Sequence, residues 1–151
     1  MNLQEELKAL QERIAEVEEQ IKGEQTFPRE DDEYWYMNEN GDVLRDEWGD
    51  FGYEKSMFTI GNVFQNENEA EFAVEKLKVE AILRKYSRPF KKDENNYYLE
   101  FCPSDKAITT YCCQRYQTQG VIYFESAEKV QQAIDEAGEW QIKRFIFGME
   151  V

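Results

Sequence analysis

The first residues of the chain place apolar side chains with the spacing of a coiled-coil helix. These side chains are separated alternately by four and three residues, which assigns them to the a and d positions of three consecutive heptads. The positions between them carry mainly Glu, Gln, Lys, Arg and Ala, which favour a helix and tolerate water. We therefore predict an oligomerisation helix over residues 1–23 with a seam formed by Leu3, Leu7, Leu10, Ile14, Val17 and Ile21.

This seam needs a partner, because a single helix of this length is only marginally stable in water. The β-branched residues Ile14 and Ile21 at a positions favour a parallel dimer, whereas Leu7 at the first a position leaves a trimer open. The alternative is a helix that folds back on its own domain. Gly23 is placed to end the helix, and the Gly, Pro and charged residues of 24–33 predict a linker.

Past the linker the apolar pattern changes to that of β-strands. The segment "YWYMNENGDVL", which begins at Tyr34, holds an aromatic run, an Asn-Gly pair and a short return, and this order predicts a β-hairpin. The segment "KSMFTIGNVF" predicts a further strand that ends at Phe64. A helix is expected next, because apolar residues recur at helical spacing between Asn66, a good N-cap, and Pro89.

The same order of elements recurs in the second half of the chain. An aromatic strand is expected at 95–101 and a shorter strand at 119–124. Ser126 then takes the N-cap place that Asn66 has in the first half, and Gly138 ends the second helix. The recurrence of both the order and the cap positions indicates an internal duplication.

The duplication determines the predicted fold class. Two β-β-α units, at about 34–88 and 95–138, are followed by a final strand at 141–149. One such unit alone cannot bury enough apolar surface. We therefore predict an α+β fold in which the N-terminal coiled-coil helix precedes a duplicated β-β-α unit, which forms one antiparallel sheet with helices on one face. The predicted organisation is a helix at 1–23, a linker at 24–33 and an α+β domain at 34–151.

Charge and composition exclude several classes of function. The 151 residues include 18 Lys and Arg against 32 Asp and Glu, a net charge of −14, and there is no histidine. Such a chain repels a phosphate backbone, so direct nucleic-acid binding is not expected. Three cysteines without histidine make a metal site, a cofactor and histidine-based catalysis unexpected, and the chain is predicted not to be an enzyme. No segment resembles a membrane span or a secretory signal, which predicts a cytoplasmic protein.

The stretch from Glu30 to Glu54 is a candidate surface for a basic partner. It holds ten acidic residues and one basic residue, Arg45, interleaved with large aromatic side chains. Aromatic residues supply much of the binding energy at protein interfaces, and acidic neighbours attract a basic protein. Trp35 and Tyr53 are expected instead to cover the face of the sheet opposite the helices. The predicted partner-binding residues are Trp48 and Phe51 with Asp46, Glu47 and Asp50.

A second candidate is the segment "ITTYCCQRYQTQG", which begins at Ile108. An arginine beside an aromatic ring is able to hold a nucleotide-like ligand by stacking and charge. This hypothesis requires further basic groups to meet the segment in a pocket between protomers. The residues concerned are Arg115 and Tyr116, with Lys143 or Arg144.

The segments "YWYMNENGDV", "IGNVFQNENEAEFAVEKLK" and "VIYFESAEKVQQAIDEAGEWQIKRFIFG" together resemble small uncharacterised proteins of tailed phages and prophages. The N-terminal coiled coil is an addition to that pattern. The resemblance implies the cytoplasm of a bacterial host and supplies no active site. It leads us to expect a non-enzymatic, homo-oligomeric accessory protein that binds and inhibits a host protein of anti-phage defence. The alternatives are a sponge for a nucleotide second messenger and a structural or scaffolding protein of the virion.

Overall fold

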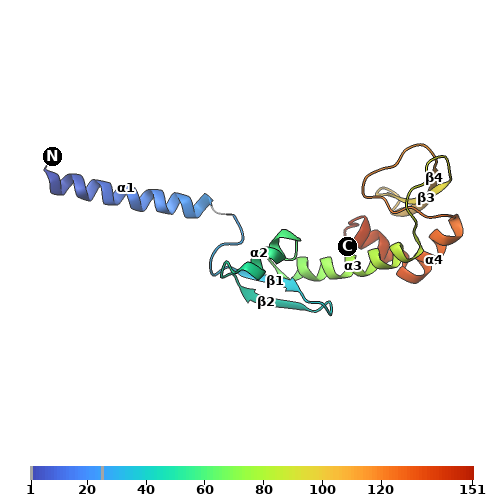
Figure 1. Cartoon of the computed structure of the whole chain (residues 1–151), viewed down its shortest axis with the longest axis horizontal. Coiled ribbons are helices and arrows are strands. Elements are labelled where there is room, and N and C mark those ends of the chain that lie inside the picture. Colours follow the sequence, from blue (N-terminus) through green and yellow to red (C-terminus); the bar gives the residue numbers. More distant parts are fainter. Residues whose placement is uncertain (1, 25) are drawn as a thin grey trace. The chain divides into compact units, whose positions relative to one another are not determined.

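The computed structural model describes residues 2–24 and 26–151, without the side chain of Lys22, as helices and short strands (Figure 1). The chain divides into two compact units, one up to Ala70 and one from Glu71 to Val151. The division falls within one helix, α3 (Glu67–Tyr86).

The predicted N-terminal helix is present as α1 (Leu3–Glu24). Asn2 and Glu5 cap its first turn reciprocally: the Glu5 amide donates to Asn2 Oδ1 at 2.9 Å, and the Asn2 amide donates to Glu5 Oε2 at 3.0 Å. This capping box satisfies two amides that the helix itself leaves unpaired. All six seam side chains are exposed, with exposed fractions from 37% for Val17 to 83% for Leu3.

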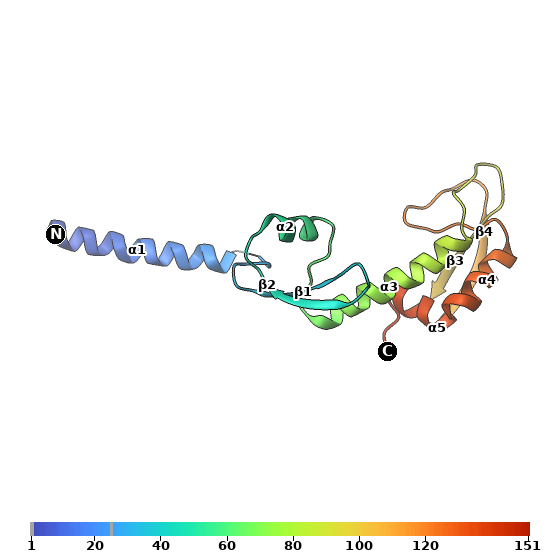
Figure 2. The same ribbon diagram turned by 60° about the horizontal axis from the view of Figure 1, so that its bottom comes forward.

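The predicted hairpin of the first unit is also present. β1 (Glu33–Met37) pairs antiparallel with β2 (Val43–Glu47), in a register that sets Tyr34 opposite Asp46 and Trp35 opposite Arg45. The turn between the strands contains Gly41 at a φ of 80°, a conformation that glycine adopts without strain. α2 (Gly52–Thr59) lies over one face of this hairpin (Figure 2).

The helix α2 corrects one prediction, because a strand was expected over its second half and the residues that follow. Helix formation is favoured at its C-terminus by a Schellman motif. The Asn62 amide donates to Met57 O at 2.8 Å, the Gly61 amide donates to Phe58 O at 3.0 Å, and Gly61 has a φ of 79°. The Gly-Asn pair that seemed part of a strand therefore ends a helix.

After α2 the chain returns to β1 at two points instead of pairing along a third strand. The Asn62 side chain accepts a hydrogen bond from the Met37 amide and donates one to the Met37 carbonyl, both at 2.8 Å. Phe64 exchanges backbone hydrogen bonds with Trp35 at 2.9 and 3.0 Å. Only Phe64 thus forms a bridge to the sheet where a full strand was predicted.

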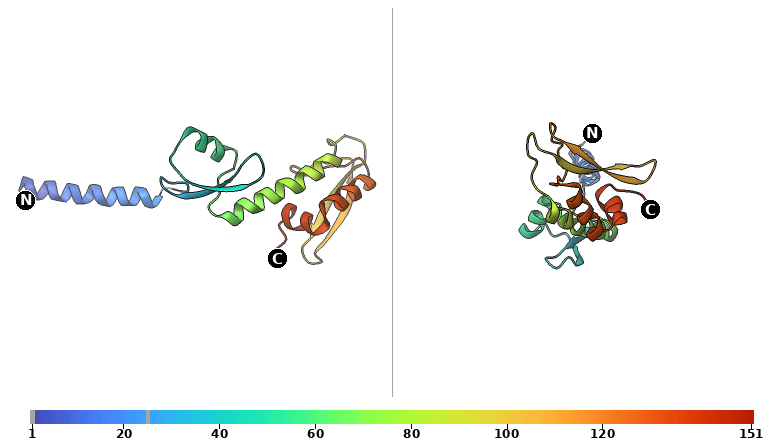
Figure 3. Two further views of the ribbon diagram at one scale, coloured as in Figure 1. Left: turned by 90° about the horizontal axis from the view of Figure 1, so that it is seen from below. Right: turned by 90° about the vertical axis from the view of Figure 1, so that its right-hand side faces the viewer.

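The second unit repeats this arrangement. β3 (Asn96–Cys102) pairs antiparallel with β4 (Ala107–Cys113), and Phe124 bridges to Tyr97 as Phe64 bridges to Trp35. α4 (Ala127–Ala137) follows and packs beside β3 (Figure 3). Its N-cap is Ser126, whose side chain accepts from the Lys129 amide at 3.2 Å. The strand predicted at 119–124 is likewise reduced to a single bridge.

The α+β class and the order of helix and β-β-α units are therefore confirmed, while the single sheet is not. The strands form two separate two-stranded sheets, β1-β2 and β3-β4. Each helix predicted from a cap is present: the Asn66 side chain accepts from the Glu69 amide at 2.9 Å at the start of α3, which ends at Tyr86 before Pro89.

The predicted final strand at 141–149 is wrong. This part of the chain forms α5 (Glu139–Gln141), followed by a π-helical turn, η1 (Ile142–Ile146). Helical spacing turns Ile142 fully inwards and sets the Phe145 ring 5.1 Å from the Phe72 ring. Apolar residues separated by three and four positions are buried better by a helix than by a strand.

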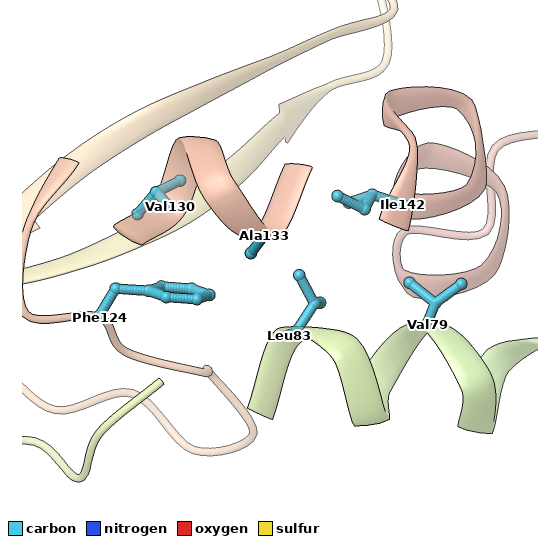
Figure 4. Packing of buried hydrophobic residues seen from close by; sticks show 6 residues of the cluster. All are labelled: Val79, Leu83, Phe124, Val130, Ala133 and Ile142. Carbon is cyan, nitrogen blue, oxygen red and sulfur yellow. The ribbon is translucent and has the colours of Figure 1, made fainter. Parts of the chain in front are cut away.

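The core of the second unit joins three elements and the bridge residue. The side chains that point towards one another are Val79 and Leu83 of α3, Val130 and Ala133 of α4, Phe124, and Ile142 (Figure 4).

A fully buried side-chain amide, that of Asn96, fixes the loop before β3. Its oxygen accepts a hydrogen bond from the Lys91 amide at 2.9 Å, and its nitrogen donates to the carbonyl oxygens of Lys91, Glu94 and Cys113.

Candidate interaction surface

Trp48, predicted to bind a partner, belongs instead to the core of the first unit. Its side chain is 6% exposed. The Trp48 ring stands edge-on to Tyr34 at 5.6 Å and to Phe58 at 6.3 Å between ring centroids. These contacts hold α2 against the hairpin, so the Trp48 ring is not available to a partner.

Phe51 lies on the surface beside Tyr53, a residue that the sequence analysis assigned to the sheet. Tyr53 was expected to cover a sheet face, yet Phe51 and Tyr53 are each 57% exposed. Their rings are parallel to within 6°, with centroids 5.8 Å apart. This offset stack is a favoured arrangement for two aromatic rings. Trp35 is half-buried, on the face of the hairpin opposite Tyr34.

Contacts with Gly49 and Glu54 hold Phe51 in place within the stacked pair. The Phe51 ring lies against Gly49 so closely that a Cβ at this position would overlap it. Phe51 is the N-cap of α2, and the N3 residue Glu54 accepts hydrogen bonds from the amides of Phe51 at 3.0 Å and Gly49 at 2.9 Å. One carboxylate oxygen thereby fixes both the loop and the start of the helix that carries Tyr53.

Glu54 is fully buried, and its surroundings keep it ionised. Burial alone would raise the pKa of Glu54, but the hydrogen bond from the Phe51 amide, the interaction with the nearby Tyr34 hydroxyl and the hydrogen bond from the Gly49 amide together outweigh burial and lower it. Burial and the Glu54 carboxylate together raise the pKa of Tyr34 well above its ordinary value. Within the described residues, Glu54 Oε2 and the Tyr34 hydroxyl have no hydrogen-bond partner at full bonding geometry, although the two groups interact electrostatically.

Acidic side chains flank the pair, although Glu47 lies on the Trp35 face of the hairpin, opposite the face that carries Tyr34 and Asp46. Asp46, Glu47 and Asp50, all predicted partner-binding residues, are exposed. Partial burial and the negative charges of Glu54 and Asp46 raise the pKa of Tyr53. The Tyr53 hydroxyl therefore lies close to negative charge. Lys55 is 3.5 Å from Asp50, an exposed ion pair that screens little of this charge. The surface formed by Phe51, Tyr53, Asp46 and Asp50, here called the aromatic-acidic surface, therefore suits a basic partner, and the structure does not bring the predicted residue Glu47 into it.

The second candidate site is not assembled in the same way. The Arg115 guanidinium lies over the exposed Tyr116 ring at 5.4 Å. Lys143 instead pairs with Glu139 at 3.0 Å, while Arg144 lies over the Phe72 ring at 4.9 Å and donates to the Met149 carbonyl. The two pairs of residues are thus engaged with different neighbours within the chain.

The second unit also contains an apolar pocket of about 250 Å³. Leu83, Leu99, Ile122 and Phe124 supply its walls, with Lys76 and Glu80 among the lining residues. Among the residues that the structure describes, no three of the metal-ligating types gather in one place. None of the described helices is both long enough and apolar enough to cross a lipid bilayer.

Comparison of the chain with models of known protein families, with curated proteins and with solved structures gave no match.

The sequence analysis did not identify Tyr53 as a residue of this surface or the buried Glu54 as the residue that supports it. A signal for both was present, since Glu54 stands three residues after Phe51 at the start of a short segment that ends in glycine. Such spacing is typical of a capped helix. A helix predicted at this position would have placed the Tyr53 side chain on the surface and not on the sheet.

Proposed function

We propose that this chain is a non-enzymatic, phage-encoded accessory protein that binds and inhibits a basic host protein of anti-phage defence, acting as a homo-oligomer. The observation that carries this proposal is the exposed Phe51–Tyr53 stack, which is fixed by a buried carboxylate and surrounded by acidic side chains. The phage setting and the cytoplasm of a bacterial host come from the sequence resemblance alone.

The aromatic-acidic surface has the properties of a binding hot spot. Large aromatic side chains that are already ordered lose little conformational entropy when a partner covers them. Here Gly49 and Glu54 order both rings before binding. Asp46, Glu47 and Asp50 would accelerate the approach of a basic protein, an effect that added salt weakens.

The exposed seam of α1 supports the homo-oligomeric part of the proposal. Six apolar side chains at a and d positions are exposed along one helix, and burial of each Leu or Ile contributes about 1.5–3 kcal/mol. A second copy of α1 offers the same stripe at the same spacing. Two joined copies would present two aromatic-acidic surfaces to one target, which raises the apparent affinity without any new contact.

The test compares the full-length protein with Phe51→Ala/Tyr53→Ala and with Tyr116→Ala, a matched change of an exposed ring elsewhere. Each is used to capture host proteins from a bacterial lysate, and the captured protein is then purified and assayed for binding and for its own activity. We expect the double variant to lose affinity by on the order of 100-fold. Tyr116→Ala should bind and inhibit as the original chain does.

Equal binding by the double variant would reject the aromatic-acidic surface as the binding site. A target that is bound and remains fully active would reject inhibition. A co-purified nucleotide that Tyr116→Ala releases would replace the proposal by the second-messenger sponge.

A further inference from the structure

The edge strand β4 has a row of backbone groups that no part of the described chain covers. Tyr97 uses its amide and carbonyl to bond Phe124, at 3.0 and 2.8 Å, so these groups point away from β4. Backbone groups alternate in direction along an antiparallel strand. Tyr98, opposite Tyr111, therefore points towards β4, and the residues of β4 whose amides and carbonyls point outwards are Ile108, Thr110 and Cys112.

This edge lacks the features by which proteins keep edge strands from pairing. Charged side chains and proline protect such edges, and the β4 sequence "AITTYCC" has neither. The corresponding edge strand of the first unit, β2, has the sequence "VLRDE" and carries three exposed charged side chains. The four residues from Thr109 to Cys112 are exposed, so no side chain of the described chain shields the edge.

A second copy of β4 complements this edge. In an antiparallel pair centred on Thr110, Thr110 meets its own counterpart and Ile108 meets Cys112 of the other copy, so each outward amide meets an outward carbonyl. No like charges oppose each other along the shared ladder.

We propose that β4 pairs antiparallel with β4 of a second copy of this chain, with the twofold axis at Thr110. This inference rests on the proposed homo-oligomer and adds a self-association contact separate from α1.

Charge exchange at the axis tests the register. The full-length variants Thr110→Lys and Thr110→Glu each place like charges opposite each other, and a mixture of the two places opposite charges there. We expect each variant alone to show a dissociation constant on the order of ten-fold higher by analytical ultracentrifugation, and the mixture to recover the original value. Thr118→Lys, which adds the same charge at an exposed threonine outside β4, should leave the constant unchanged.

Amide hydrogen exchange locates the contact without any substitution. In the assembled protein the amides of Ile108, Thr110 and Cys112 should exchange at least ten-fold more slowly than the outward amides of Val43 and Arg45 on β2. Dilution to the monomer should remove this difference.

The inference is overturned if the Thr110 variants associate as the original chain does, if the mixture fails to recover, or if the three β4 amides exchange freely in the assembled state. The seam variant Leu10→Glu/Ile14→Glu separates this failure from failure of the proposed coiled coil. An unchanged mass for the seam variant with weakened Thr110 variants rejects the coiled coil and supports β4 pairing. Slow exchange that requires a bound host peptide would assign the edge to that peptide instead.

Discussion

The side chain of Asn62 forms with the backbone of Met37 the pair of hydrogen bonds that a neighbouring strand would form, each at 2.8 Å. One amide side chain thereby extends the attachment of α2 to the hairpin beyond the single bridge at Phe64. Both Asn62 and Met37 are half-buried, so water does not fully replace these bonds when they are lost.

We therefore expect Asn62→Ala to lower the free energy of unfolding by about 1–3 kcal/mol, since it leaves the Met37 amide and carbonyl without partners. Denaturant unfolding followed by tryptophan fluorescence measures this change, because Trp35 and Trp48 lie in the same unit. Asn68→Ala, an exposed position on α3, serves as the control and should change stability little. Equal stabilities of the two variants would show that the side-chain pairing contributes nothing.

Acid should weaken the first unit through Glu54. The pKa of Glu54 is lowered in the folded protein, so its carboxylate stabilises the fold above its ordinary pKa of 4.5, and this contribution is lost as the pH falls through the lower folded value. Glu54→Gln keeps an oxygen for the two amides but cannot ionise. The difference in unfolding free energy between the original chain and Glu54→Gln should be largest near pH 7 and shrink below pH 4.5.

Denaturant unfolding at a series of pH values measures that difference. The other acidic residues contribute to both proteins and cancel in the comparison. A difference that is constant between pH 7 and pH 3 would contradict the assigned role of the Glu54 charge.

Truncation of Trp48 and of Phe51 should have different effects on stability, although the two residues are only three positions apart. Trp48→Ala removes a buried ring and should lower the free energy of unfolding by about 3–5 kcal/mol. Phe51→Ala removes an exposed ring and should change stability by less than about 1 kcal/mol while it weakens partner binding. Thermal unfolding of the two variants gives the comparison, and a large loss of stability in Phe51→Ala would place its ring in the core.

Two glutamates in the seam should abolish association through α1. Leu10→Glu/Ile14→Glu places charges at adjacent d and a positions, where burial of a charge is strongly unfavourable. We expect a folded protein of lower mass than the original chain at micromolar concentration, measured by light scattering after size exclusion, and a monomer when Thr110→Lys is added. Ala9→Glu/Ala15→Glu adds the same charges outside the seam and should keep the original mass. If the seam variant also keeps it, α1 does not drive assembly.

Local signals predicted the parts of this fold that depend on local interactions. The heptad spacing gave α1, the Asn-Gly turn gave the first hairpin, and Asn66 and Ser126 gave the starts of α3 and α4. Strand propensity misled at α2, where capping interactions at both ends of the segment favour a helix. The segment over α2 is rich in aromatic residues, yet the buried Glu54 and the Schellman turn at Gly61 decide its conformation.

The candidate surface was only partly predictable from the sequence, because it depends on tertiary packing. Composition located an aromatic and acidic stretch, but which ring is buried depends on the packing of α2 against the hairpin. Trp48 contacts Tyr34 and Phe58, residues that are fourteen and ten positions away in the sequence. A sequence pattern over a few neighbours contains no information on such contacts.

The two hairpins are followed by different segments. The difference lies between the second strand of each hairpin and the residue that bridges back to the first strand. In the first unit this interval holds α2, and in the second it holds a loop that leads from β4 to Phe124. Both ends of the interval are fixed by backbone bonds in each unit, while its contents vary. The hairpin and its bridge are thus the same in both units, while the segment between them differs. The loop between Gln114 and Gly120 is therefore the place to insert a foreign peptide, such as an epitope tag or a fluorophore-binding sequence.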